Sequence, residues 1–341
     1  MVGQRYATML SGHPFFKLTT LTGNSSVGKI YRDAVHWVDH NPIPDEVANM
    51  EIVSTNPNNV DADLVFSPLP SDAARTIEPM FADAGIPVIS EASTYRMDSD
   101  VPLIVPEVNP DHLEIISTQK RNYNREGFIV TGPNCTTSGL VMVLKPLYEN
   151  LGVKRAIVTT MQALSGAGYQ GVPSLSIIDN VIPYIKNEEE KIASETLKML
   201  GTRNNETIEE GSLGVSATCN RVPTIDGHLE TLYLESDKEI PIESAREALS
   251  SFKGIPQELK LPTAPREPII ICNEVDRPQP RLDRLSGSIP GMSVVVGRIR
   301  EGLDNKSLRL TLLTHNTIRG AAGNAILIAE LLVAKGMIGS R

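Results

Sequence analysis

The chain has 341 residues, 21% of them charged, with a formal net charge of -9 and an isoelectric point near 5.3. This acidic balance argues against a nucleic-acid partner, which a basic face would recognise. No apolar run is as long as the roughly 20 residues that a helix needs to cross a bilayer. The three cysteines are widely spaced, which predicts neither a disulfide framework nor a metal site. We expect a cytoplasmic protein that acts on a small molecule, without a membrane partner.

The first third of the chain alternates short apolar runs with helical patterns. The runs are FKLTTLTG (16–23), DLVFSPLP (63–70), IPVISEAS (86–93) and FIVTGPNC (128–135). This alternation predicts an α/β domain with a Rossmann-like, doubly wound parallel sheet. Such a sheet normally opens with a strand and a Gly-rich turn, whereas this sequence begins with MVGQRYATML, which already has a helical pattern. We therefore expect the first strand to be missing.

The remainder of the chain has longer apolar runs. These are AIVTTMQAL (156–164), HLETLYLES (228–236), MSVVVGRIR (292–300) and SLRLTLLTH (307–315). They predict a second, α+β domain on a mostly antiparallel sheet, with helices near 174–186, 189–201 and 242–252. An apolar terminal helix is expected to return to the first domain. The predicted division is residues 1–132 plus 317–341 for nucleotide binding, and 133–316 for catalysis and oligomerisation.

The stretch GPNCTTSGL (132–140) places Cys135 just before an apolar helical pattern. Free amides and the dipole at a helix N-terminus stabilise an anion and lower the pKa of a thiol. The sequence therefore predicts that Cys135 is an ionised nucleophile. Cys219 and Cys272 lie among β-branched residues and are expected to be packing residues.

Several motifs in a fixed order carry a resemblance to a known family. They are GPNCTTSGL (132–140), MQALSGAGYQG (161–171), CNRVPTIDGH (219–228), DRPQPRLDR (276–284) and HNTIRGAAG (315–323). With these the whole chain resembles the aspartate-semialdehyde dehydrogenase family, especially its archaeal and fungal branch, and it is similar also to malonyl-CoA reductase. The resemblance implies NADP-dependent reductive dephosphorylation of 4-phospho-L-aspartate to L-aspartate 4-semialdehyde, a step towards lysine, threonine and methionine.

The resemblance also implies roles for four residues around the reacting carbon. Cys135 would form the thioester and His228 would act as its base, since a histidine can move a proton at neutral pH. Gln162 would orient the substrate. Asn134, or the backbone amide of Cys135, would donate a hydrogen bond to the developing oxyanion.

Four further residues would bind the substrate. Arg221 resembles the family arginine that pairs with the α-carboxylate, which suits a guanidinium fork. Arg96 and Lys191 would bind the phosphoryl group or inorganic phosphate. Glu188 would reach the substrate amine, although Glu188 and Lys191 are also spaced for an ordinary salt bridge on one helix face.

The cofactor choice rests on the stretch LTGNSSVGKIY (21–31), which contains no acid to bind a ribose hydroxyl. Its polar and basic side chains instead favour the 2'-phosphate of NADP. Further cofactor contacts are expected at the carboxyl edge of the sheet, in the C-terminal segment and in what remains of the family fingerprint G-A-T-G-x-V-G-Q. The predicted cofactor-binding residues are Gly3, Ser25, Ser26, Lys29, Ser67 and Asn316.

The missing strand leaves two explanations and several functions open. We favour a start codon that has been assigned too late over a genuine truncation. Besides the function above, three alternatives stay open: a malonyl-CoA reductase, a cysteine acyltransferase or hydrolase without nicotinamide, and a binding subunit with impaired catalysis. The partners expected are aspartyl phosphate, aspartate semialdehyde, inorganic phosphate and further copies of the chain, as a homodimer or homotetramer.

Overall fold

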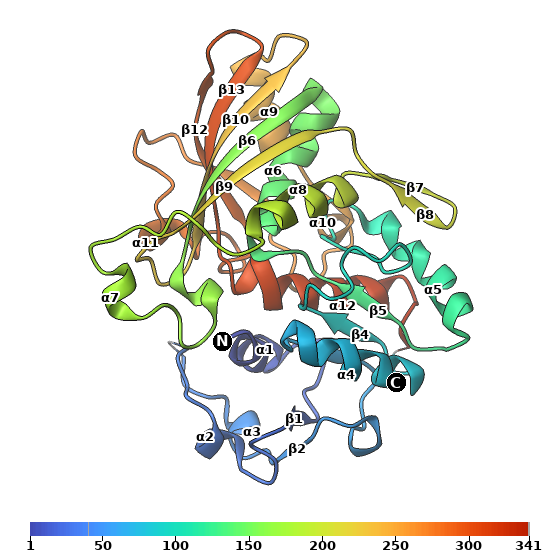
Figure 1. Ribbon diagram of the computed structural model, residues 1–341. Coiled ribbons are helices and arrows are strands. Elements are labelled where there is room, and N and C mark those ends of the chain that lie inside the picture. Colours follow the sequence, from blue (N-terminus) through green and yellow to red (C-terminus); the bar gives the residue numbers. More distant parts are fainter. Residues whose placement is uncertain (40, 340–341) are drawn as a thin grey trace.

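A six-stranded mixed sheet forms the centre of the larger part of the molecule (Figure 1). The computed structural model describes residues 1–39 and 41–339. The strand order of this sheet is β11 (Ile269–Ile271), β12 (Val294–Glu301), β13 (Ser307–Thr314), β10 (His228–Ser236), β6 (Val153–Gln162) and β9 (Gly214–Arg221). The three central pairings are antiparallel, and the outer strands β11 and β9 join in parallel. The predicted α+β architecture is therefore confirmed.

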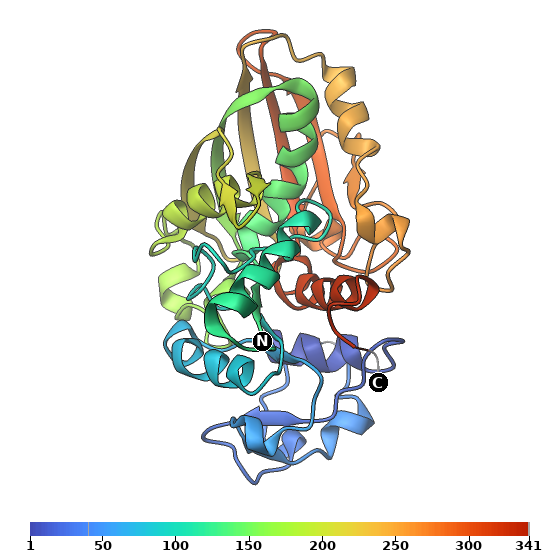
Figure 2. The ribbon, with the colours of Figure 1, turned by 90° about the vertical axis from the view of Figure 1, so that its right-hand side faces the viewer.

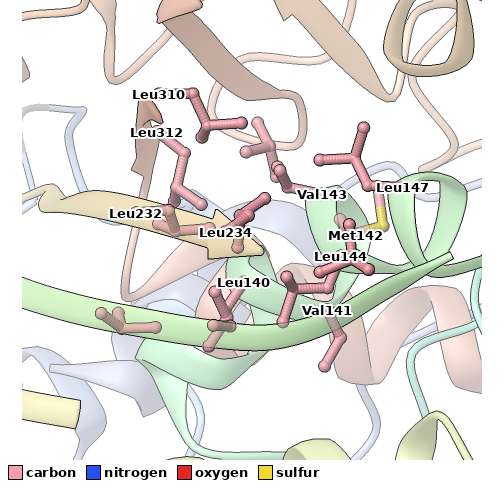
Figure 3. Close-up of a cluster of buried hydrophobic side chains, with 14 of the residues drawn as sticks. Leu140, Val141, Met142, Val143, Leu144, Leu147, Leu232, Leu234, Leu310 and Leu312 are labelled. Atoms are coloured by element: carbon pink, nitrogen blue, oxygen red, sulfur yellow. The ribbon is translucent and has the colours of Figure 1, made fainter. Parts of the chain in front are cut away.

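Helix α6 (Cys135–Leu151) covers the inner face of this sheet. The Asn134 side chain caps its first turn by accepting from two backbone amides, and Gly152 ends it in the left-handed conformation. Figure 3 shows apolar side chains of α6 facing leucines of β10 and β13. The labelled residues are Leu140, Val141, Met142, Val143, Leu144, Leu147, Leu232, Leu234, Leu310 and Leu312. Burial of each such side chain contributes about 1.5–3 kcal/mol, so the helix is held firmly on the sheet.

The smaller part contains short parallel strands. Strands β3 (Val65–Ser67), β4 (Val88–Ser90) and β5 (Ile129–Thr131) form one sheet, and β1 (Leu21–Gly23) and β2 (Ile52–Ser54) form another. They are accompanied by α1 (Val2–Leu10), α4 (Ser71–Asp83) and α5 (Ile116–Tyr123). The apolar helix α12 (Gly323–Ala334) lies between the two parts of the molecule (Figures 1 and 2) and packs on α1 and β4.

The parallel strands of the smaller part form two separate sheets. Within the described residues β1 and β3 are not hydrogen-bonded to each other, and the chain enters α1 at Val2. A cavity of about 610 Å³ separates the two small sheets. It is lined by residues 18–22 near β1, by 62–67 near β3, and by Gly3 and Tyr6 of α1.

The remaining α-helices and β-strands are short or peripheral. They are α2 (Tyr31–Ala34), α3 (Asp45–Ala48), α7 (Ser174–Ile177), α8 (Glu188–Met199), α9 (Ile242–Ser250), α10 (Ile255–Glu258), α11 (Pro280–Asp283), β7 (Thr202–Asn204) and β8 (Thr207–Glu209). The helix predicted over 174–186 is wrong beyond Ile177, because Asp179 has a positive φ of 57° and Pro183 follows. None of the described helices is long and apolar enough to cross a membrane.

Candidate active site

The register of the large sheet brings three predicted site residues into one row. Gln162 of β6 pairs with Arg221 of β9. Leu229 of β10 pairs with Met161, which places His228 beside Gln162. All three residues are buried on the inner face, where side chains of neighbouring strands at the same register meet. His228 of this row contacts Cys135, the first residue of α6.

Cys135 and His228 form the centre of this site. The Cys135 Sγ lies 3.2 Å from His228 Nε2. On the other side of the ring, His228 Nδ1 accepts a hydrogen bond of 3.0 Å from the amide of Ala163. Burial, followed by the charges of Arg221 and His315, lowers the pKa of His228 to about 3, so the imidazole is neutral. The structure therefore places a thiol and a neutral imidazole in direct contact.

The expectation that Cys135 is ionised is wrong for the protein without ligands. Burial, followed by the charge of Glu188, raises the pKa of Cys135 to about 12, against a lowering by Arg221 and Arg96. The helix start contributes less than expected, because Asn134 Oδ1 accepts from the amides of Thr136 and Thr137. Those amides are thus not available to the sulfur, and Cys135 rests as a thiol.

Asn134 is fixed by two glutamates of α8. Its side-chain nitrogen donates to Glu188 Oε1 at 2.8 Å, and its backbone amide donates to Glu195 Oε2 at 2.6 Å. With its side-chain oxygen also used as a cap, Asn134 acts here as an anchor of the helix start, which does not support its expected role at an oxyanion. Glu188 is buried beside it.

Arg96 is held by the same acidic helix. Its Nη1 donates to Glu195 Oε1 at 2.9 Å, and its Nη2 donates to the carbonyl of Glu91 at 2.7 Å. Glu195 therefore links Arg96 to the backbone of Asn134, a connection that sequence reasoning missed. The spacing offered a signal, because Glu188 and Glu195 are seven residues apart and share one face of a helix.

Lys198, a second residue that sequence reasoning missed, supports the loop that carries Arg96. Its Nζ donates to the carbonyls of Arg96, Asp98 and Val101 at 2.7, 2.7 and 2.8 Å. Burial lowers the pKa of Lys198 to about 8. The ammonium group thus joins α8 to the Arg96 loop. Lys191, on the same helix, is only half-buried.

Arg221 is the second cation near Cys135. It is buried, and its Nη1 donates to the carbonyl of Ala163 at 2.6 Å. Gly166 leaves room for it, because a Cβ there would lie 2.9 Å from Nη1. The Gln162 side chain donates to Thr160 Oγ1 at 3.3 Å. Cys135 is thus flanked by the cations Arg221 and Arg96 and by the carboxylate of Glu188, a charge pattern that suits an amino acid bearing a phosphoryl group.

The C-terminal segment closes the site from a further side. A Cβ at Gly320 would lie 2.8 Å from the Cβ of Cys135, so only glycine permits this approach. Asn316 accepts from the amide of Gly227 and donates to Ser165 Oγ. Its side chain therefore joins the loop before His228 to the loop after Gln162.

Apart from Asn316, the predicted cofactor residues belong to the smaller part of the molecule. Ser25, Ser26 and Lys29 lie on the turn after β1, where Ser25 and Lys29 are exposed. Gly3 lines the cavity between β1 and β3. Ser67 is buried and donates to Glu78 Oε1 at 2.7 Å, so its hydroxyl is already used inside the protein. An exposed turn with Lys29 and no acid, after the carboxyl end of a parallel strand, fits a 2'-phosphate.

Comparison with known proteins places the chain among similar sequences and structures. Two protein-family models match the chain. The model for the semialdehyde dehydrogenase NAD binding domain matches residues 1–116, and the model for the semialdehyde dehydrogenase dimerisation domain matches residues 144–319. The aspartate-semialdehyde dehydrogenase of Archaeoglobus fulgidus is 53% identical over 339 residues, which cover 99% of this chain and 96% of that protein. The malonyl CoA reductase (NADP) of Metallosphaera sedula is 44% identical over 344 residues, covering 100% and 96%.

A solved structure agrees with these sequence matches. The crystal structure of aspartate-semialdehyde dehydrogenase with NADP from Candida albicans superposes with a TM-score of 0.90 at 39% sequence identity. The match covers 99% of this chain and 97% of that chain. The similarity therefore extends over both parts of the fold.

Proposed function

Because the chain belongs to the aspartate-semialdehyde dehydrogenase family, we propose that it catalyses the NADP-dependent reductive dephosphorylation of 4-phospho-L-aspartate to L-aspartate 4-semialdehyde. The contact of 3.2 Å between Cys135 Sγ and His228 Nε2, flanked by buried arginines, carries this proposal. A thiol positioned in this way can attack an acyl phosphate, and the cations can bind the two anionic ends of the substrate.

In the proposed reaction each side chain acts on one part of the substrate. Cys135 attacks the acyl carbon to form a thioester, and Gln162 orients the substrate beside it. Arg221 binds the α-carboxylate and Arg96, assisted by Lys191, binds the phosphoryl group. Glu188 binds the amine.

NADP supplies the hydride when it is bound, and residues of the smaller part of the molecule would hold it. The turn that carries Ser25, Ser26 and Lys29 would bind the 2'-phosphate. Gly3, beside the cavity between β1 and β3, and Asn316 are the other candidates for contacts with the cofactor. Their role would be to bind and orient NADP, whereas the acyl chemistry belongs to Cys135.

Steady-state assays with two acyl donors test the proposed substrate. With NADPH present, 4-phospho-L-aspartate should be reduced with a kcat/KM at least about a hundredfold above that for malonyl-CoA, because Arg96 and Arg221 offer paired sites for phosphate and carboxylate. The relative from Metallosphaera sedula makes malonyl-CoA reduction the second candidate. Activity with malonyl-CoA alone would contradict the proposal.

Arg221→Lys should lower kcat/KM for 4-phospho-L-aspartate by on the order of a hundredfold although the charge is retained. One ammonium group cannot reproduce both the fork to a carboxylate and the bond to the Ala163 carbonyl. The loss should appear mainly in KM. Arg121→Lys, at an exposed ion pair of α5, is the matched control and should match the wild type. Near-normal kcat/KM in Arg221→Lys would remove Arg221 from the carboxylate site.

The protein is a homo-oligomer, and we propose a homodimer that uses the stretch 169–184. This stretch exposes apolar side chains of Tyr169, Leu175, Ile178, Val181 and Tyr184. Large exposed apolar side chains that gather in one region usually mark a protein interface. It also lies within the match to the dimerisation domain.

Leu175→Glu should shift the protein towards the monomer at micromolar concentrations, because it places a charge in that interface. Leu175 is 95% exposed within one chain. Sedimentation velocity over a dilution series measures the effect. Leu303→Glu is the control, since Leu303 is 90% exposed on the turn between β12 and β13, outside the stretch. An unchanged oligomer in Leu175→Glu would exclude the stretch as the interface.

We also propose the domain division 1–132 plus 317–341 and 133–316. The separate matches to residues 1–116 and 144–319 and the packing of α12 on α1 and β4 support it. Residues 40, 340 and 341 lie outside the described structure. A cytoplasmic location is proposed because all three cysteines are free.

A further inference from the structure

The Arg96 guanidinium is almost fully buried, but only some of its N–H groups are used. Nη1 donates to Glu195 Oε1 at 2.9 Å, and Nη2 donates to the carbonyl of Glu91 at 2.7 Å. Within the described part of the chain, Arg96 Nε has no acceptor. A guanidinium carries five N–H groups, and a buried donor without an acceptor is costly. The group is therefore suited to a further acceptor with several oxygens, such as a phosphoryl group.

Glu195 holds the guanidinium and the start of α6 at the same time. Its Oε1 accepts from Arg96, and its Oε2 accepts from the backbone amide of Asn134 at 2.6 Å. Glu195 is only 1% exposed, so neither oxygen has water as an alternative partner. Asn134 directly precedes Cys135. One carboxylate thus sets the distance between the guanidinium and the residue next to the thiol.

Lys198 holds the other end of Arg96, its backbone. The three N–H groups of its ammonium are all used, by the carbonyls of Arg96, Asp98 and Val101. The segment 96–101 belongs to no helix or strand, so its position depends on contacts of this kind. Lys198 follows Glu195 by three residues and lies on the same face of α8.

Helix α8 is itself fixed to the larger part of the molecule. It packs on α6 and β9. Ile192 and Met199 of this helix are fully buried in the apolar core beneath the large sheet. Arg96 is therefore attached, through Glu195 and Lys198, to the same rigid body that carries Cys135.

We propose that Glu195 and Lys198 are positioning residues that hold Arg96 at a fixed distance from Cys135 to receive the phosphoryl group. This inference rests on the function proposed above. Glu195 acts on the guanidinium and Lys198 on the backbone of Arg96. A fork of N–H donors binds an oxyanion well only when its direction is fixed, so the loss of either residue should weaken phosphate binding more than binding of the rest of the substrate.

The first test measures the affinity of the full chain for inorganic phosphate by isothermal titration calorimetry. Lys198→Met keeps the length of the side chain and removes its N–H groups. It should raise the Kd for phosphate on the order of tenfold. Lys238→Met, at an exposed lysine after β10, is the matched control and should keep the wild-type Kd. An unchanged Kd in Lys198→Met would overturn the role of Lys198.

Circular dichroism establishes that Lys198→Met is folded before its Kd is compared. If this variant does not fold, Lys198→Gln replaces it, because glutamine keeps an amide donor for part of the carbonyl set. The Kd for phosphate should then change in the same direction, and an unchanged Kd would again overturn the role of Lys198.

The second test uses Glu195→Gln, which keeps the size of the side chain. An amide has one acceptor oxygen, so it cannot accept from both Arg96 and Asn134. With the semialdehyde, NADP and phosphate as reactants, the KM for phosphate should rise on the order of tenfold and that for the semialdehyde should stay within about twofold. An equal rise in both values would show a merely structural role. A fall in the KM for phosphate would show that the negative charge of Glu195 opposes phosphate, and would overturn the positioning role.

Glu190→Gln is the matched control for this variant, because Glu190 is exposed on the same helix. Its two KM values should equal those of the wild type.

A double-mutant cycle shows whether Lys198 acts through Arg96. Arg96→Lys loses the fork and should weaken phosphate binding by itself. Adding Lys198→Met to Arg96→Lys should then raise the Kd by less than about twofold, because the group that Lys198 positions is already lost. Additive effects of the two substitutions would overturn the proposal.

These tests also distinguish the inference from the proposed function, because phosphate binding is measured without an acyl substrate. Weakened phosphate binding in Lys198→Met, together with no reduction of 4-phospho-L-aspartate by the wild type, would refute the proposed substrate and support the positioning role. Normal reduction together with wild-type phosphate affinity in Lys198→Met would refute the positioning role of Lys198 and leave the substrate standing. A wild type that does not bind phosphate would overturn the anion site at Arg96.

Discussion

Cys135→Ala is expected to lower kcat by at least about a thousandfold, because the covalent step then has no nucleophile. The site should otherwise remain intact, since the α6 cap is made by Asn134. Affinity for NADPH, measured by fluorescence titration, should stay within about twofold of the wild type. Turnover retained in this variant would rule out the thioester.

Cys272→Ala is the matched control for this substitution. Cys272 is also a free and partly exposed cysteine, but it follows β11, and its amide bonds to Val296. The kcat of Cys272→Ala should equal that of the wild type.

The resting state of Cys135 gives a dependence on pH. Because burial raises its pKa to about 12, alkylation by iodoacetamide without ligands should be slow at neutral pH. The rate should rise with pH throughout the alkaline range, as the thiolate fraction grows. A plateau near neutral pH would show an ionised thiol instead.

Arg319→Met should destabilise the protein by about 3–5 kcal/mol, because it leaves a buried carboxylate without its partner. Arg319 and Glu107 are both fully buried and form a bidentate pair, in which Arg319 Nη1 lies 3.0 Å from Glu107 Oε2. Arg319 Nε also donates to the carbonyl of Met292 at 2.8 Å. Urea unfolding followed by circular dichroism measures the loss.

Two further variants show whether that loss comes from the unpaired charge. Replacing both partners, with Arg319→Met and Glu107→Leu together, should recover much of the stability. Arg121→Ala, at an exposed pair with Glu206, should cost less than about 1 kcal/mol. A cost below about 1 kcal/mol for Arg319→Met would show that this buried ion pair does not stabilise the fold.

The sequence by itself determined the elements and the residue types of the site. Alternating apolar residues predict the strands of the large sheet, and the polar turn GPNCTTSGL predicts the start of α6 at Cys135, because both signals are local. The helical pattern of MVGQRYATML likewise predicts α1. The prediction of a helix over 174–186 was wrong beyond Ile177, because the positive φ of Asp179 ends the helix despite the apolar pattern.

Only the tertiary structure decided the ionisation and the connections of that site. The pKa of Cys135 depends on burial and on Glu188, more than fifty residues away in the sequence, so the local amides do not decide it. The Ser67 hydroxyl donates to Glu78, and Glu195 and Lys198 hydrogen-bond to Arg96. The spacing of these residues along the sequence does not predict such contacts. Cys135 and His228 are 93 residues apart in the sequence, and only the folded chain brings their side chains into contact.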